Sequence, residues 1–170
     1  MIIIGDVYKF AILVAYMPDW NVNAVPWNNE GSSGNGILLY STDGHLFPSE
    51  ILTTPLGTDL NYLVTQESFK PPINLNYFYM NKEDAFKSML FLARPMYVDI
   101  TSENEFDEMY FLEMPTANAE ANCYFFYVSD GSKVRILGAK LHENDELGGA
   151  FYNQKEKPVE IYEAILSIQE

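Results

Sequence analysis

The sequence predicts an α+β fold: a mostly antiparallel sheet built from β-hairpins, with one main amphipathic helix packed on it. Residues 123–128 are all apolar or aromatic and lead to Asp130-Gly131, after which residues 133–136 alternate in polarity. Asp-Gly favours the positive φ angles of a tight turn, so this pattern is typical of a β-hairpin. Residues 82–93 instead repeat apolar side chains at helical spacing. Together the two segments predict a sheet with a helix on one face.

A two-residue loop at Asp130-Gly131 sets the register that we expect for this hairpin, with Val128 opposite Lys133. Alternation along the strands then gives one apolar face, formed by Cys123, Phe125, Tyr127, Val134 and Ile136. The other face carries Lys133 and Arg135 among apolar residues. These two cations must therefore reach solvent, a carboxylate or an aromatic ring.

The N-terminal part predicts one interrupted strand and one long loop. Residues 1–16 form a strand with a break near Gly5-Asp6, and its second half is apolar enough for a central strand covered on both faces. Residues 17–36 are rich in Asn, Gly and Pro and hold both tryptophans, Trp20 and Trp27. Long loops in compact domains are often functional, so these tryptophans either bind a partner or cap the edge of the core.

A second hairpin is expected around residues 42–44. Residues 37–40 form its first strand and residues 45–47 its return, which ends at Pro48 because proline has no N–H for the ladder. His45 follows the turn glycine and is expected to be exposed. A single exposed histidine is a weak sign of a metal or catalytic site, since such sites need several convergent donors.

Residues 52–66 fit a short helix from Thr58, which we favour, or a further strand, and an edge strand is expected at residues 73–79. Asn81 is a good N-cap for the main helix, residues 82–93, which ends at Arg94-Pro95. The helix has an apolar stripe that we expect to pack on the sheet, formed by Ala85, Phe86, Met89, Leu90 and Ala93.

Two further strands are expected after the main helix, at residues 96–100 and 109–114. Residues 101–108 form an acidic loop or a single turn between them. Residues 115–121 form a loop that leads into the hairpin at residues 123–137.

The C-terminal third contains one expected turn and one ambiguous segment. Residues 142–149 predict a solvated acidic turn, and because EF-hand spacing is absent from residues 142–146, we expect no metal site there. Residues 159–168 alternate as a strand does but also fit a helical face. We favour the strand.

Length and composition predict one folded domain over residues 1–170. The chain is 48% hydrophobic and 15% aromatic, which excludes a disordered protein. Its single cysteine, Cys123, has no partner for an intramolecular disulfide and fits a small buried side chain. With no signal peptide and no apolar run that could cross a bilayer, we expect a cytoplasmic protein.

The net charge of −14 comes from 24 acidic and 10 basic residues. This charge argues against nucleic acid and anionic membranes as partners, because both would be repelled. Residues 95–132 contain no Lys or Arg. A partner attracted over long range should therefore be basic, although the acidity would also serve solubility alone.

Sequence motifs for catalysis are absent. There is no P-loop, no dinucleotide fingerprint and no Gly-x-Ser-x-Gly. Carboxylate pairs are frequent, but an acidic chain brings them together by chance, and none lies in an apolar setting that would separate two pKa values. We therefore expect no enzyme, no catalytic residue, no metal and no cofactor.

Several blocks form a pattern of strands and turns: Ile4-Gly5, Phe10-Ala11-Ile12, residues 35–40, Gly44, Phe47-Pro48, residues 123–131 and residues 134–137. This pattern is similar to the immunity proteins of bacterial polymorphic toxin systems, in particular the family numbered forty-two. The resemblance implies a small cytoplasmic α+β protein, made by the toxin-producing cell, that binds its cognate effector and blocks it. It implies no catalytic residues.

An inhibitor of a basic-surfaced toxin gains association rate from an acidic face. We expect that face to include Glu103, Glu105, Asp107 and Glu108, with Trp20 or Trp27 as an aromatic anchor. The alternative is an aromatic-rich module that binds a small ligand or carbohydrate, with the two tryptophans as its stacking platform. The oligomeric state remains open.

Overall fold

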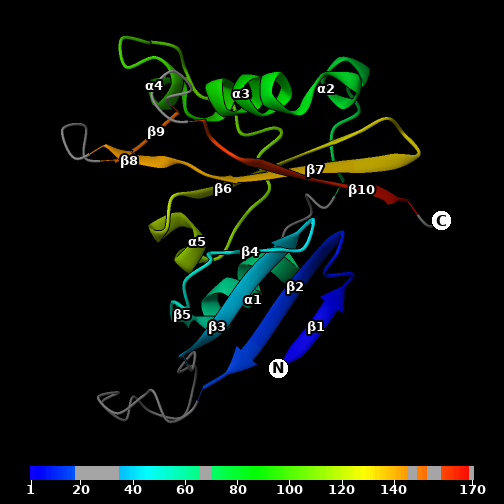
Figure 1. Ribbon diagram of the computed structural model, residues 1–170, viewed down its shortest axis with the longest axis vertical. Helices are drawn as coiled ribbons and strands as arrows, with labels where there is room; N and C mark the ends of the chain where they lie inside the picture. The colour runs from blue at the N-terminus through cyan, green and yellow to red at the C-terminus, as the bar shows by residue number, and fades with distance from the viewer. Residues whose placement is uncertain (18–34, 66–69, 145–148, 153–157, 169–170) are drawn as a thin grey trace.

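The computed structural model describes residues 1–17, 35–65, 70–144, 149–152 and 158–168. Figure 1 shows a layer of helices above a three-stranded sheet, with a second sheet packed below it. All strand pairs in these sheets are antiparallel, so the predicted α+β fold with mostly antiparallel sheet is confirmed.

The N-terminal sheet has the strand order β1-β2-β3-β4, and β5 pairs with the other end of β3. Its strands are β1 (Ile2–Gly5), β2 (Phe10–Tyr16), β3 (Asn35–Thr42), β4 (His45–Phe47) and β5 (Thr54–Pro55). The predicted second hairpin is confirmed, because both residues of its turn, Asp43 and Gly44, have positive φ angles of 52° and 77°.

The predicted break near Gly5-Asp6 is present, but residues 1–16 form two strands rather than one interrupted strand, because the chain turns there and β1 pairs antiparallel with β2. Gly5 has a φ angle of 105°, and a Cβ atom built on it would lie 2.4 Å from the carbonyl oxygen of Phe10. Only glycine fits this close approach between β1 and β2. Strand β2 lies inside the sheet, and its alternate residues pack into two different apolar clusters.

The second sheet has the order β10-β7-β6 and forms the middle layer in Figure 1. Its strands are β6 (Cys123–Ser129), β7 (Lys133–Lys140) and β10 (Ile161–Ser167). The C-terminal segment is therefore a strand, as we favoured. A short ladder between β8 (His142–Asn144) and β9 (Gly149–Phe151) extends from β7, so part of the expected acidic turn is paired strand.

The predicted register of the β6–β7 hairpin was wrong by two residues. Ser129 pairs with Val134, so the two-residue loop is Gly131-Ser132 rather than Asp130-Gly131. The Asp130 carboxylate accepts hydrogen bonds from the N–H groups of Ser132 (2.8 Å) and Lys133 (2.7 Å), which holds Asp130 at the strand end, and Gly131 takes the positive φ of 97°. A shift of two keeps every side chain on its predicted face.

Both faces of this hairpin are covered. The apolar face predicted from the sequence packs against the N-terminal sheet and helix α1 (Leu56–Thr65), in a central cluster that includes Leu38, Tyr40, Phe47, Cys123, Phe125, Tyr127 and Ile136. The rings of Tyr40 and Phe47 each meet Phe125 edge-on, with centroids 5.1 Å apart. The opposite face is covered by the main helix, α3 (Lys82–Ala93).

The main helix follows the prediction in its bounds, cap and buried face. The side chain of Asn81 accepts a hydrogen bond from the N–H of Asp84 (2.9 Å), and the predicted apolar stripe is buried. The predicted helix near Thr58 is also present, as α1, and begins two residues earlier.

Three short helices lie in segments that were predicted to be strand or loop. Residues 73–79, expected as an edge strand, contain α2 (Leu75–Tyr79), and residues 96–100, expected as a strand, lie largely in α4 (Pro95–Val98). Residues 115–121, expected as a loop, contain α5 (Thr116–Glu120). Each helix has only four or five residues, too few to form without tertiary contacts.

Residues 109–114 form no regular strand, contrary to expectation. Phe111 makes a single antiparallel bridge to Phe126 on the outer edge of β6. Two backbone hydrogen bonds accompany it: the N–H of Tyr127 donates to Tyr110 (2.9 Å), and the N–H of Leu112 donates to Phe125 (3.0 Å). The segment therefore covers this edge of the sheet without extending the ladder.

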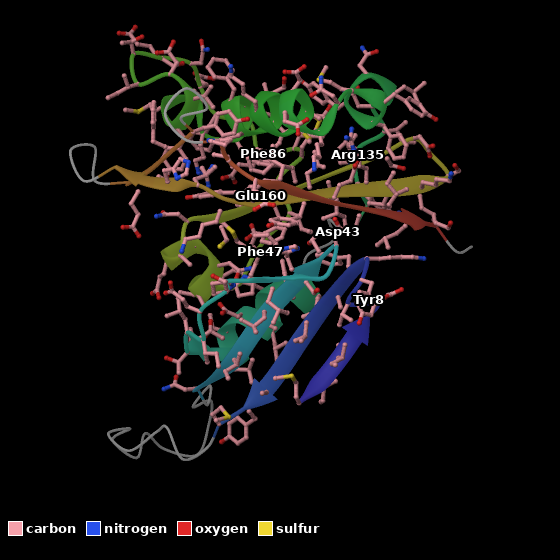
Figure 2. All side chains as sticks on the ribbon, viewed as in Figure 1. Tyr8, Asp43, Phe47, Phe86, Arg135 and Glu160 are labelled. Atoms are coloured by element: carbon pink, nitrogen blue, oxygen red, sulfur yellow. The ribbon has the colours of Figure 1, made fainter. Side chains whose placement is uncertain are left out.

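Arg135, labelled in Figure 2, is one of the two hairpin cations that were expected to reach solvent, a carboxylate or an aromatic ring. Its side chain is buried and its Nε donates to Glu163 on β10 (2.5 Å), while Nη1 donates to the carbonyls of Tyr77, Phe78 and Met80 at the end of α2. Lys133 is exposed to solvent. The expectation that these cations reach a carboxylate or solvent is confirmed.

Candidate protein-interaction site

The four acidic residues predicted to bind a partner lie together on one exposed loop. We call residues 99–108 the acidic loop; it follows α4 at one end of the helical layer in Figure 1. Glu103, Glu105, Asp107 and Glu108 are all exposed. The predicted aromatic anchors, Trp20 and Trp27, lie outside the described residues, so the structure does not relate them to this loop.

Hydrogen bonds within the acidic loop fix its backbone. The Asp99 carboxylate accepts from both the N–H (3.0 Å) and the hydroxyl (2.7 Å) of Thr101, and these bonds lower the pKa of Asp99. The hydroxyl of Ser102 accepts from the N–H of Asn104 (3.3 Å). Side chains of this kind replace helix or sheet partners in turns, so the loop has a defined conformation of its own.

The loop is also attached to the end of α3. The N–H of Asp107 donates to the carbonyl of Leu92 (2.7 Å). Arg94 donates through Nη1 to Glu108 (2.5 Å) and to the carbonyl of Ala93 (2.6 Å), and its guanidinium carbon lies 5.2 Å from the ring centroid of Phe111. The ion pair with Arg94 therefore helps to position the loop. It also compensates part of the charge of Glu108.

Glu103 and Glu105 have a different setting. Neither forms an ion pair with another residue in the part of the chain that the structure describes. Together with Asp107 they present negative charge toward solvent. Of the four predicted residues, these three are the ones whose charge a partner would meet directly.

An open hollow of about 540 Å³ lies between the acidic loop and α4. Its walls combine apolar and charged side chains, among them Pro95, Met96, Tyr97, Glu103, Phe106 and Glu108. Such a mixture suits a cationic side chain with an aliphatic stem, since the stem covers apolar surface while the charged head meets the carboxylates.

Four large apolar side chains around the loop are exposed: Phe106 by 70%, Met96 by 59%, Met109 by 55% and Ile100 by 46%. Aromatic residues and methionine are enriched in protein interfaces. This group was not predicted, because residues 96–100 were expected to form a strand. The signal that was present is Phe106, an aromatic residue with acidic residues on both sides.

The surroundings of Cys123 and His45 are those of structural residues. Cys123 is buried, as predicted, and burial raises the pKa of its thiol to about 11, which opposes formation of the nucleophilic thiolate. His45 is exposed, as predicted, and its ring stacks on Tyr162 with centroids 3.7 Å apart. Among the described residues, no group of three or more His, Cys, Asp or Glu side chains is arranged to hold a metal ion.

The model of the family described as immunity protein 42 matches residues 1–170. The chain belongs to the immunity protein 42 family. This membership confirms the resemblance drawn from the strand and turn pattern and gives the protein an immunity role. A search of the curated proteins finds no match.

A solved structure has the same fold as this member of the immunity protein 42 family. The crystal structure of CdiI from Burkholderia dolosa AUO158 is 18% identical in sequence, with a TM-score of 0.66 over 99% of this chain and 92% of that chain. At this identity the likeness establishes the fold alone. None of the helices within the described ranges is long and apolar enough to span a membrane.

Proposed function

We propose that this protein neutralises a cognate toxin by direct contact, and that the toxin docks on the acidic loop and the apolar side chains beside it. The family match supports a toxin as the partner. The observation that supports the loop as the contact surface is the coincidence of exposed carboxylates and exposed apolar side chains at residues 96–109. We further propose that the contact forms in the cytoplasm, where a single buried thiol stays reduced.

Charge gives the proposed surface its selectivity. Residues 95–132 contain no Lys or Arg, and among the described residues Arg94, which pairs with Glu108, is the cation that contacts the acidic loop. A basic toxin surface would be attracted over about a Debye length and would associate faster at low salt. The nucleic acid and anionic membrane partners that the net charge argues against would be repelled by the same field.

The fixed backbone of the loop supports tight binding. Ordering a flexible loop on binding costs free energy, and this loop is already held by the Asp99 and Ser102 turns and by the bond from Asp107 to Leu92. Phe106 supplies an exposed aromatic side chain beside the hollow. Anchors of this kind carry a large share of the binding energy in protein interfaces.

The test is charge reversal of Glu103 and Glu105 to Lys, with toxin association followed by stopped-flow fluorescence at several salt concentrations. We expect the association rate to fall at least about tenfold at low salt, and the difference to shrink as salt is added. Phe106→Ala should instead speed dissociation, because it removes buried contact rather than long-range attraction.

The matched control reverses Glu50 and Glu120, two exposed acids outside the loop, to Lys. It changes the net charge by the same amount. If both double variants slow association equally, the effect belongs to the overall charge and the acidic loop is not the contact surface. Unchanged rates in both would contradict an acidic interface altogether.

The carbohydrate-binding alternative has less support. It depends on Trp20 and Trp27, which lie outside the described residues, and on aromatic side chains available for stacking. The aromatic residues of β6 are buried in the core, Phe125 and Phe126 completely. The family match favours the immunity role.

A further inference from the structure

The edge strand β1 exposes three isoleucines in a row. Ile2, Ile3 and Ile4 are exposed by 64%, 54% and 60%, although they lie in a regular strand paired with β2. Ile2 and Ile4 share the face of Ile12 and Val14, and Ile3 lies on the opposite face. Both faces of the strand are therefore apolar and open to solvent.

The sheet edges at β6 and β4 are protected. The outer edge of β6 is covered by backbone hydrogen bonds with Tyr110, Leu112 and the segment before α2, and β4 ends at Pro48. Within the described residues, β1 has no strand on its outer side and no charged residue along its length. An unprotected apolar edge is a template for pairing with another strand.

Charge indicates which partner the edge suits. The first seventeen residues contain one acid and one base, Asp6 and Lys9, and are neutral overall, whereas the whole chain carries −14. A basic toxin gains no attraction from a neutral edge. Two copies of the chain, by contrast, repel each other least where a neutral surface meets a neutral surface.

The sequence of β1 is suited to pairing with itself. If two copies meet antiparallel about a two-fold axis at Ile3, then Ile3 lies opposite its own copy and Ile2 lies opposite Ile4 of that copy. Every isoleucine then meets an isoleucine, and no charged residue lies within the ladder. We propose that the protein forms a symmetric dimer in which two β1 strands join the N-terminal sheets into one continuous sheet.

This dimer leaves the proposed toxin site free. In Figure 1, β1 lies at the end of the molecule away from α4, beside which the acidic loop is placed. The inference therefore does not rest on the proposed function. A ladder of three residues from each strand, with six isoleucines in all, buries less than the roughly 1,200–2,000 Å² of a stable interface, so we expect dissociation in the micromolar range.

The test is sedimentation of the full chain from low micromolar to several hundred micromolar protein at about 0.15 M salt, which screens the net repulsion. The unchanged protein should pass from monomer to dimer across this range. Ile3→Lys and Ile3→Glu should each remain monomeric, because each places like charges opposite one another at the two-fold axis. An equimolar mixture of the two variants should form a heterodimer, since the charges are then opposite.

The matched control is Ile51→Lys, which changes an isoleucine that is 70% exposed and lies outside the strands. This variant should dimerise as the unchanged protein does. Amide exchange of residues 2–5 in the unchanged protein should slow with rising concentration, a readout that needs no variant. A monomer at every concentration, or a dimer that survives in both Ile3 variants, would overturn the proposal. Loss of toxin binding in Ile3→Lys without any dimer of the unchanged chain would overturn it too, and would assign β1 to the toxin.

Discussion

Arg135 shows how one residue joins elements that are distant in the sequence. It comes from β7, and its guanidinium contacts Glu163 on β10 and three carbonyls at the end of α2. Carbonyls at a helix C-terminus have no partner within the helix, and a cation there also interacts favourably with the helix dipole. The buried charge is thus compensated by hydrogen bonds on two sides.

Arg135→Met should lower the free energy of unfolding by about 3 kcal/mol, because Glu163 and the α2 carbonyls lose their donor while the volume of the side chain is largely kept. Urea denaturation followed by circular dichroism measures the change. Lys133→Met, on the same strand but exposed, is the control and should stay within about 0.5 kcal/mol. Equal effects of the two changes would show that the Arg135 contacts contribute little.

At the residue scale, the alternation of side chains along the β6–β7 hairpin correctly predicted the face on which each one lies, although the predicted register was wrong. Cys123, Phe125 and Tyr127 lie in the central cluster as expected, because a shift of two residues preserves the facing. The sequence could not predict which partner Arg135 would find. Glu163 is 28 residues away, and its position depends on how β10 pairs with β7.

At the scale of elements, the pairing of β6 with β7 depends on a glycine beneath an aromatic ring. Phe125 lies opposite Gly138, and a Cβ atom added to Gly138 would lie 2.4 Å from Cε1 and 2.7 Å from Cδ1 of that ring. The ring is completely buried and held edge-on by Tyr40 and Phe47, so it has no space into which to move.

Gly138→Ala is expected to destabilise the protein by about 1–2 kcal/mol. Overpacking costs about 1–3 kcal/mol, and the reduced freedom of the unfolded chain offsets part of it. The measurement is a thermal or urea melt, with a double-mutant cycle as the control. In a Phe125→Leu background the same change should cost clearly less; an equal cost would mean that the ring contact is not the cause.

Local sequence signals predicted the longer elements and missed the short ones. The cap at Asn81 and the apolar stripe defined α3, and turn residues defined two hairpins. Helix α5 has no capping side chain of its own; the carboxylate of Asp59, far away in the sequence, accepts from the N–H (3.0 Å) and hydroxyl (2.8 Å) of Thr116. Contacts of this kind cannot be predicted from the pattern of neighbouring residues.

At the scale of the whole molecule, a net charge of −14 sets the response to salt. Like charges on a compact surface repel, which favours the expanded, unfolded chain. Raising the ionic strength from about 0.01 M to about 0.15 M shortens the Debye length from about 30 Å to about 8 Å and screens most of this repulsion.

The melting temperature should therefore rise by about 2–4 °C over that range, which corresponds to about 1 kcal/mol for a chain of this size. Scanning calorimetry in sodium chloride measures it. A variant with Glu103→Gln and Glu105→Gln should show a smaller rise, because both acids are exposed within a stretch rich in acidic residues. A melting temperature that stays constant or falls would show that repulsion is already compensated in the folded state.

The acidic part of the proposed interface could be predicted from the sequence, but its apolar part could not. The acidic residues of 101–108 can be identified directly in the sequence. The exposure of Met96 and Met109, by contrast, follows from the short helix α4 and from the single bridge that replaces a strand. The tertiary arrangement thus determines which apolar residues reach the surface.

The acidic loop is joined to the helix beside it by a backbone hydrogen bond from Asp107 to Leu92, whereas the side chains of Glu103, Glu105 and Phe106 extend into solvent. Support and recognition are thereby carried by different atoms. Replacing those three side chains leaves this attachment in place, so under the proposed docking a few surface substitutions would change which toxin is recognised without rebuilding the core.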